Sequence, residues 1–186
     1  RSGDGVINND DKYCAGDPNP DFTYGLFTSF SWKGLSLNIA CNGSYGNDIV
    51  NANLLQETEV VGLRASNIRR EAYLNAWTPE NQDTRYPALG CMAADEVKFL
   101  SDRIVEDGSF LRLANVGLTY SIPLPKNKVI RNMTVGLAVK NCYVWTKYSG
   151  WDPEVNSFGK DMTRMGIDCG SYPSARTFCF DLKFTF

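Results

Sequence analysis

The first residues of the chain have the types and spacing of a calcium-binding loop. Calcium takes several oxygen ligands from one short loop, and a glycine in that loop allows its sharp turn. In the pattern D-x-[DN]-x-[DN]-G-x-I-x-x-x-[DE], the first ligand would precede Arg1, so the loop is incomplete in this chain. An Asx-rich turn without an ion is the alternative. The ligands that the chain supplies are Ser2, Asp4, Val6 through its carbonyl, Asn8 and Asp11.

Six cysteines form a second set of reactive side chains. They are widely scattered and no two form a C-x-x-C pair, which argues against a zinc ribbon or a thioredoxin-type site. One interpretation is an oxidising compartment with one to three disulfides, and the other is a set of free, buried thiols. The six are Cys14, Cys41, Cys91, Cys142, Cys169 and Cys179.

Aromatic and charged residues between 148 and 176 have the chemistry of a ligand-binding surface. Aromatic rings stack on sugar rings, and carboxylates accept hydrogen bonds from hydroxyl groups. The alternative is that the run Trp151-Asp152-Pro153 simply folds its loop. The candidate ligand contacts are Tyr148, Trp151, Asp152, Glu154, Tyr172 and Arg176.

The composition excludes several other kinds of chemistry. The chain has no histidine, which removes Ser-His-Asp catalysis and histidine-based zinc ligation. It has no paired carboxylates, P-loop or nucleophile elbow, so the sequence predicts no catalytic residue and no enzyme. Apart from possible Ca²⁺, no cofactor is required. A net charge of −2 gives no electrostatic footprint for nucleic acid. No apolar run reaches the roughly 18 residues of a transmembrane helix.

Five segments with alternating apolar and polar residues must position these groups. The alternation predicts strands, and at about 10–13 residues they are longer than the usual 5–6. In the last strand, Phe178, Phe180, Leu182, Phe184 and Phe186 share one face. The expected strands span residues 22–32, 35–45, 109–121, 132–145 and 176–186.

The connections between these strands alternate in length. Residues 33–34 and about 122–131 make short turns, whereas about 46–108 and 146–175 are long. Short periplasmic turns and long extracellular loops are typical of outer-membrane β-barrels. We therefore expect an all-β transmembrane fold with extracellular loops at about 1–21, 46–108 and 146–175 and a periplasmic C-terminus. The long loop also carries one helical candidate, about Ser66 to Ala76, with Ser66 as its cap and Ile68, Ala72 and Tyr73 on one face.

The competing fold is a β-sandwich, which would make the chain a soluble or surface-exposed glycan-binding module. It explains neither the strand length nor aromatic residues at the strand ends, where a bilayer meets water. Five strands cannot close a transmembrane barrel, which needs about eight. We therefore expect the other strands to come from residues outside this chain.

The strand alternation places Cys142 and Cys179 on the polar, lumen-facing side. If Trp145 pairs with Arg176, the two cysteines lie directly opposite each other. Opposed Cβ atoms are about 4.5–5.5 Å apart, slightly wide for a disulfide. The pattern therefore indicates a possible disulfide, with a different strand register as the simpler alternative.

Six stretches, in order and spread over the whole chain, resemble the SusC/RagA family of TonB-dependent outer-membrane transporters. Each stretch alone is a weak signal, and six in register are a strong one. They are NPDFTYG at 19–25, GSYGND at 43–48, NAWTPEN at 75–81, DGSFLRL at 107–113, YSGWDPEV at 148–155 and GIDCGSYP at 166–173.

The resemblance implies the five C-terminal antiparallel strands of a 22-stranded barrel in the bacterial outer membrane. Such a transporter imports glycans, or in some members oligopeptides, together with a SusD-like surface lipoprotein. Its energy comes from the TonB complex through an N-terminal part, and its plug would lie outside this chain. The terminal Phe186 resembles the aromatic signal that barrel-assembly machinery selects.

Overall fold

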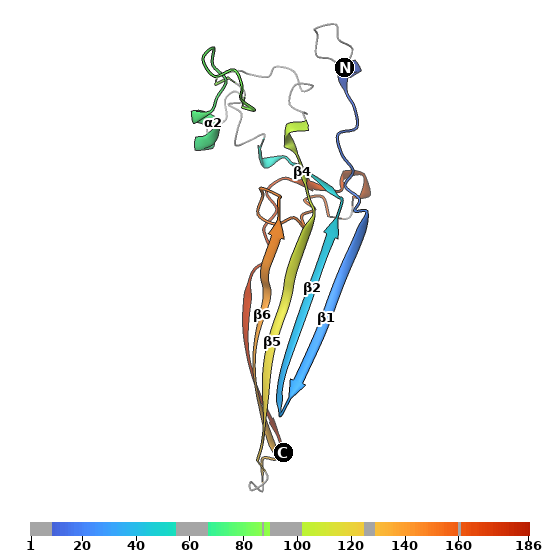
Figure 1. Ribbon diagram of the computed structural model, residues 1–186, viewed down its shortest axis with the longest axis vertical. Coiled ribbons are helices and arrows are strands. Elements are labelled where there is room, and N and C mark those ends of the chain that lie inside the picture. Colours follow the sequence, from blue (N-terminus) through green and yellow to red (C-terminus); the bar gives the residue numbers. More distant parts are fainter. Residues whose placement is uncertain (1–8, 55–66, 87, 90–101, 125–128, 160) are drawn as a thin grey trace. The chain divides into compact units, whose positions relative to one another are not determined.

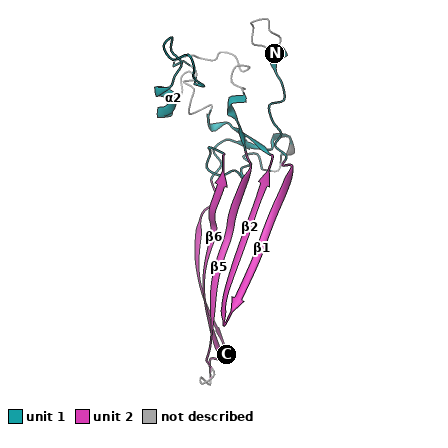
Figure 2. Cartoon of the chain, in the orientation of Figure 1, with its two compact units in different colours: residues 1–19, 47–107, 148–172 teal, residues 20–46, 108–147, 173–186 magenta. Residues whose placement is uncertain are grey.

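The computed structural model describes residues 9–54, 67–86, 88–89, 102–124, 129–159 and 161–186. It consists mostly of antiparallel strands with little helix (Figure 1). The chain divides into two compact units (Figure 2). Unit 1 comprises residues 1–19, 47–107 and 148–172, and unit 2 comprises residues 20–46, 108–147 and 173–186.

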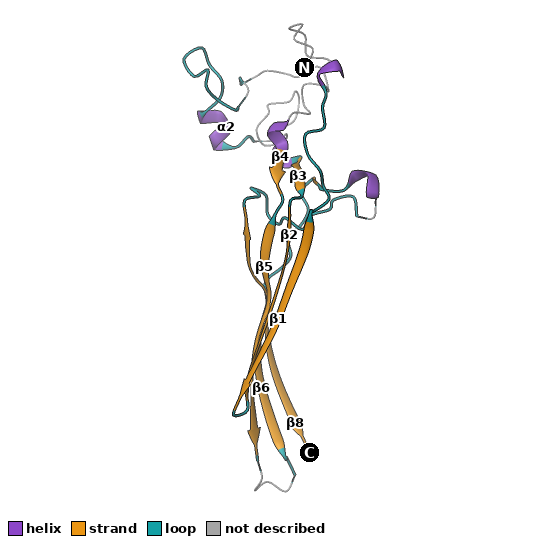
Figure 3. Cartoon of the chain, turned by 45° about the vertical axis from the view of Figure 1, so that its right-hand side comes forward, coloured by secondary structure: helices purple, strands orange, loops and turns teal. Residues whose placement is uncertain are grey.

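Unit 2 is a single five-stranded sheet in the order β1-β2-β5-β6-β8. Every neighbouring pair is antiparallel, which confirms the predicted all-β meander. Figure 3 shows these strands as the longest elements of the chain. The five are β1 (Phe22–Trp32), β2 (Leu35–Tyr45), β5 (Phe110–Pro123), β6 (Asn132–Thr146) and β8 (Thr177–Thr185). The bounds of β1 and β2 coincide with the expected ranges, and those of the other three differ by one or two residues.

A two-residue turn joins β1 to β2. Lys33 has φ 45° and Gly34 has φ 86°, and positive φ at both central residues is the mark of a type I′ hairpin turn. Glycine adopts this conformation without strain. The Gly34 carbonyl accepts a 2.8 Å hydrogen bond from the Ser121 amide. The turn therefore fixes the β1–β2 register and is tied to β5 as well.

Two bulges at one level of the sheet explain where the sequence alternation breaks. Ala114 of β5 is an extra residue between the pairs Ala40–Asn115 and Cys41–Leu113. The next strand, β6, bulges at Asn141, which has φ 52° and donates a 3.0 Å hydrogen bond from Nδ2 to the Ala175 carbonyl. Bulges change which face a side chain joins. For this reason β5 alternates cleanly only after residue 114.

The bulge at Asn141 lies just before the residues on which the predicted disulfide depended. Pairing of β6 with β8 ends at Lys140 opposite Thr177, and Cys179 lies opposite Ala138. Trp145 is therefore not paired with Arg176, and Cys142 does not face Cys179. Both thiols are free, so the predicted disulfide is wrong and the register alternative holds.

Unit 1 contains a small three-stranded sheet in the order β4-β3-β7. Its strands are β3 (Asp48–Asn51), β4 (Val105–Asp107) and β7 (Ile167–Asp168), and β3 pairs antiparallel with β4 and parallel with β7. Ile49 and Ile104 are almost fully buried and supply apolar core. The short 3-10 turns are η1 (Asn9–Asp11), η3 (Asp102–Ile104) and η4 (Met162–Arg164).

The predicted helix is present but short: α2 spans Arg70–Leu74. Its N-cap is Arg69, which makes no side-chain capping hydrogen bond, and Ser66 lies outside the described residues. Of the expected apolar face, Ala72 is buried whereas Tyr73 is 62% exposed. In the described part of the chain, no helix has the length and hydropathy of a membrane span.

Candidate functional site

One face of the five-stranded sheet of unit 2 is covered by large apolar side chains. Residues that pair directly across strands point to the same face, and one such row crosses all five strands. The row runs Phe30, Leu37, Leu118, Leu137 and Phe180. Other members of the face are Leu26, Trp32, Tyr120, Phe178, Leu182 and Phe184.

Most of these side chains are not covered by the described part of the chain. Phe178 is 75% exposed, Leu26 66% and Leu137 60%. Contiguous apolar surface of this extent marks an interaction with another protein or a membrane. The strands of unit 2 are 9–15 residues long, and about 9–11 tilted residues cross a bilayer.

The opposite face of the sheet is polar and small. The matching row there runs Ser29, Asn38, Gly117, Ala138 and Cys179. Two aromatic residues also lie on this face: Phe110, which pairs with Ser44 and is buried, and Phe27, which pairs with Ala40 and is 69% exposed. The odd position of Phe27 in the β1 alternation is a sequence signal for this placement.

Aromatic rings gather at the two ends of the apolar face. At the end where β1 begins, Phe22 and Tyr45 stack with ring centroids 5.4 Å apart. Tyr143 and Trp145 meet edge to face at 4.8 Å on β6. At the other end lie Trp32, Tyr120, Phe184 and Phe186. Amphipathic rings at both ends of an apolar band match a bilayer with two interfaces.

The described sheet also has two edge strands, β1 and β8, each with a neighbour on one side only. Unpaired backbone groups are not tolerated in lipid, so a spanning sheet must close on itself. A membrane role for unit 2 therefore requires further strands beside β1 and β8.

Unit 1 has a buried polar centre that the sequence analysis did not find. The Tyr148 hydroxyl donates a 2.6 Å hydrogen bond to Oδ2 of Asp168, and both residues are buried. The other oxygen of Asp168 accepts the amides of Gly170 and Ser171, each at 3.0 Å. Burial raises the pKa of the Tyr148 phenol far above its ordinary value, and both the hydrogen bond that the phenol donates to Asp168 and the negative charge of Asp168 add to this.

A second part of this polar centre links β3 and β4 to the residues after β6. Glu106 accepts hydrogen bonds from the amide and hydroxyl of Ser149, each at 2.7 Å. The Asn51 amide donates to Ser149 Oγ at 3.2 Å and to Glu106 Oε1 at 3.4 Å. Its Oδ1 is buried without a hydrogen-bond partner among the described atoms. Glu106 and Asp168 belong to the short strands β4 and β7, which lie outside the predicted strands, so no local pattern marked this centre.

The six predicted ligand contacts separate into two groups. Tyr148 and Asp152 are buried within unit 1, and Oδ1 of Asp152 accepts the Glu154 amide at 3.0 Å. Trp151 is 79% exposed and Tyr172 88%, and Glu154 and Arg176 are also exposed. The first group has the contacts of residues that fold the loop. The second group remains available to a ligand.

The remaining predicted sites fall largely outside the described residues. Of the calcium loop, Ser2, Asp4, Val6 and Asn8 lie outside them, and Asp11 ends the 3-10 turn η1. No cluster of three metal-binding side chains occurs in the part of the chain that the structure describes. Cys91 also lies outside that part, and Cys14, Cys41 and Cys169 are free thiols like Cys142 and Cys179.

Comparison with known proteins gives relatives along the whole chain. "TonB-dependent receptor P3" of Formosa agariphila is 35% identical over 99% of this chain, which covers 18% of that protein. "TonB-dependent receptor SusC" of Bacteroides thetaiotaomicron is 30% identical over the full chain, which covers 17% of it. The chain thus spans less than a fifth of the length of these curated relatives. No family model matches.

Solved structures give the same result. The RagAB peptide importer in its open-open state matches 90% of this chain with a TM-score of 0.75 and 30% identity. The closed-closed state of RagAB matches 98% of it with a TM-score of 0.76 and 28% identity. The chain covers 17% and 20% of the matched chains.

Proposed function

This chain belongs to the SusC/RagA-like TonB-dependent receptors, as a C-terminal segment of one, and we propose that it forms barrel wall and extracellular loops of an outer-membrane nutrient importer. The observation that carries the proposal is the apolar face of unit 2, which crosses five strands and has an aromatic band at each end. Lipid is the cover that fits such a face.

In this proposal the barrel has 22 strands, and the two open edges of unit 2 pair with the rest of it. The connections from β2 to β5 and from β6 to β8 both leave the sheet at the end where β1 begins. These long connections lie outside the cell, and the Lys33–Gly34 turn and the end of β8 lie in the periplasm.

The first experiment tests the membrane assignment on the full-length receptor in its own cells. The receptor is expected in the outer-membrane fraction and in solution only with detergent. An epitope inserted at residues 80–83, within the β2–β5 connection, should be stained on intact cells, whereas one inserted in the Lys33–Gly34 turn should be stained only after permeabilisation. Extraction into plain buffer would instead support the β-sandwich module.

The substrate of the importer is a glycan or an oligopeptide, taken up with a SusD-like lipoprotein and with energy from TonB. One relative of solved structure is described as a peptide importer, which supports the oligopeptide class. Within this chain the exposed Trp151 and Tyr172 are the ring faces available for such a ligand.

The second experiment measures uptake by a strain that depends on this receptor for growth. Trp151→Ala and Tyr172→Ala should slow growth on the imported substrate and leave growth on a simple monosaccharide or free amino acids unchanged. Tyr73→Ala is the matched control, because Tyr73 is also an exposed aromatic but lies on α2. Growth of all three variants at the parental rate would remove Trp151 and Tyr172 from the ligand site.

A further inference from the structure

Charge is divided unevenly between the sheet of unit 2 and the rest of the chain. Of 21 acidic residues, Asp181 alone lies in β1, β2, β5, β6, β8 or the turns within β1–β2 and β5–β6. Those same segments hold seven of the 19 basic residues. The two turns contain basic residues and no acidic ones: Lys33, Lys126, Lys128 and Arg131. Lys126 and Lys128 lie outside the described residues, whereas Lys33 and Arg131 lie within them.

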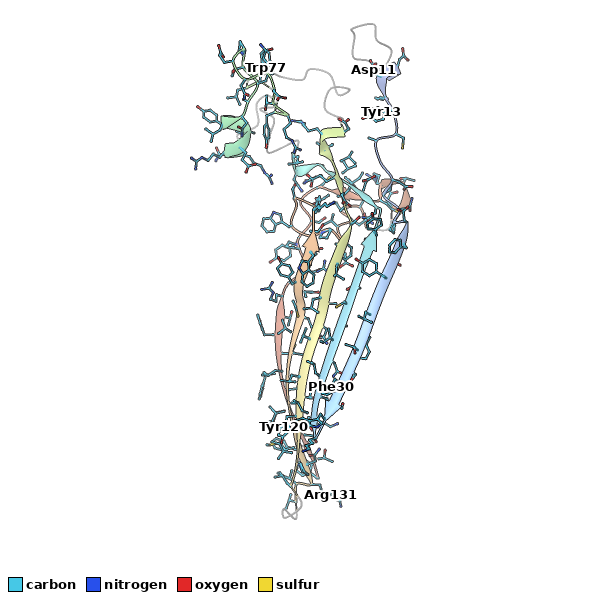
Figure 4. All side chains as sticks on the ribbon, in the orientation of Figure 1. Asp11, Tyr13, Phe30, Trp77, Tyr120 and Arg131 are labelled. Carbon is cyan, nitrogen blue, oxygen red and sulfur yellow. The ribbon has the colours of Figure 1, made fainter. Side chains whose placement is uncertain are left out.

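Both described cations are held at one end of the apolar face. Lys33 is in the β1–β2 turn, whose Gly34 carbonyl accepts from the Ser121 amide at 2.8 Å. The Arg131 amide donates to the Thr185 carbonyl at 2.8 Å, and its own carbonyl accepts from the Leu124 amide at 3.0 Å. These backbone hydrogen bonds fix both residues to one end of the sheet. Figure 4 labels Tyr120 and Arg131 at that end.

Lys33 lies beside an aromatic ring that faces outward, and Arg131 adjoins the strand pairing that carries two more aromatic residues. The Lys33 ammonium is 5.1 Å from the ring centroid of Trp32, which is 60% exposed. A cation over an indole face gains electrostatic attraction. Arg131 directly precedes Asn132, the first residue of β6, and Asn132 pairs with Thr185 of β8. Thr185 is flanked in the sequence by Phe184 and Phe186. The side chains of both cations are exposed to solvent. An apolar band that ends in aromatic rings and then in exposed cations is complementary to a phospholipid leaflet, in which the apolar acyl chains are covered by phosphate headgroups.

We propose that Lys33 and Arg131 form a binding surface for the phosphate headgroups of phospholipids in the leaflet at this end of the barrel. This inference rests on the proposed membrane function and adds a lipid preference to it. The segment before β1 and the two long connections join the sheet at its other end and together hold the other twenty acidic residues, so the attraction for anionic headgroups is confined to one leaflet.

The test uses the full-length receptor, delipidated in detergent and titrated with phosphatidylglycerol or phosphatidylcholine, with bound lipid counted by native mass spectrometry. The wild-type receptor should retain more phosphatidylglycerol than phosphatidylcholine. One Lys or Arg near a lipid surface corresponds to about a five-fold preference. Lys33→Gln and Arg131→Gln should each lower the preference several-fold, and the double variant further. Added 0.5 M salt should weaken it through screening.

Arg85→Gln is the matched control, because it also removes one exposed positive charge but lies in unit 1. It should leave the preference unchanged. Equal phosphatidylglycerol preference in the wild-type receptor and the double variant would overturn the proposal, as would no preference in the wild type. Neither result touches the membrane assignment, which fails only if the receptor needs no detergent.

Discussion

Tyr148 and Asp168 form a buried hydrogen-bonded pair, with 2.6 Å between the phenol oxygen and Oδ2 of the carboxylate. The two residues come from different segments, one just after β6 and the other from β7. Tyr148 is 5% exposed and Asp168 2%. The pair joins both ends of the connection between β6 and β8, which contains Trp151 and Tyr172.

Tyr148→Phe should loosen this connection. The change removes the phenol hydroxyl and leaves Oδ2 of Asp168 buried without that hydrogen-bond donor. This should lower the stability of the connection by about 1–3 kcal/mol. Amide hydrogen exchange over residues 148–172 of the full-length receptor should become faster, while exchange in β5 and β6 stays as it was. Unchanged exchange in 148–172 would show that the pair does not hold the connection.

The same pair predicts a pH effect with a definite sign. The pKa of Tyr148 is raised in the folded protein above the ordinary value of about 10. A raised pKa gives stability that is complete below about pH 10 and is lost as the pH rises above it. In a difference absorbance spectrum at 295 nm, wild type minus Tyr148→Phe, no tyrosinate signal should develop at pH 11. A signal that titrates near pH 10 would contradict burial of the phenol.

The two faces of the sheet should respond differently to a charge. Leu118 lies in the apolar row and its neighbour Thr119 on the polar face. Leu118→Lys should destabilise the folded barrel by roughly 1–2 kcal/mol, a value between the cost of a lysine at the bilayer midplane and its cost at the interface. Thr119→Lys is the matched variant and should cost much less. Urea unfolding of the full-length receptor in lipid vesicles measures both, and equal losses would mean that the apolar row does not meet lipid.

Gly43 of β2 should not accept a side chain. It pairs with Tyr24, whose hydroxyl donates a 2.9 Å hydrogen bond to the Phe110 carbonyl across it. A Cβ at Gly43 would clash with the Tyr24 ring and with that carbonyl oxygen. Gly43→Ala should therefore lower the free energy of unfolding by about 1–3 kcal/mol. Tyr24→Phe loses only the hydrogen bond and should lower it by about 1 kcal/mol. The two unfolding midpoints in the same urea assay rank the variants, and the reverse order would count against close packing over Gly43.

Asn141 should be sensitive to the shape of its replacement. Its φ of 52° is strained for a β-branched residue. Backbone strain in Asn141→Val should therefore lower the free energy of unfolding by about 1–3 kcal/mol. The variant also loses the hydrogen bond to the Ala175 carbonyl. Asn141→Gly relieves the strain and loses only the hydrogen bond. If glycine and valine reduce the urea midpoint equally, the bulge is not what selects asparagine here.

The sequence predicts the sheet well wherever alternation is unbroken. The Lys33–Gly34 turn and the regular pattern on both sides of it determine β1 and β2 to the residue. Alternation alone cannot locate a bulge, because the residue that bulges changes the parity by one. Ala114 and Asn141 therefore obscured the first half of β5 and shifted the β6–β8 register.

The polar centre of unit 1 depends on contacts that local patterns do not contain. Tyr148 and Asp168 are 20 residues apart, and Asn51 and Ser149 are 98 apart. The loop residues with ligand chemistry were identifiable by type, but burial of Tyr148 and Asp152 and exposure of Trp151 and Tyr172 follow only from how these distant segments meet.

The connectivity of the sheet has an evolutionary consequence. Its register is fixed by the Lys33–Gly34 turn and by cross-strand ladders, while both long connections leave from the opposite end. An insertion or deletion between the short strands within residues 47–107 or 148–172 therefore does not shift any strand of unit 2. We expect those two regions to tolerate length changes and diverge quickly among descendants of a common ancestor, while the strands change only by substitution.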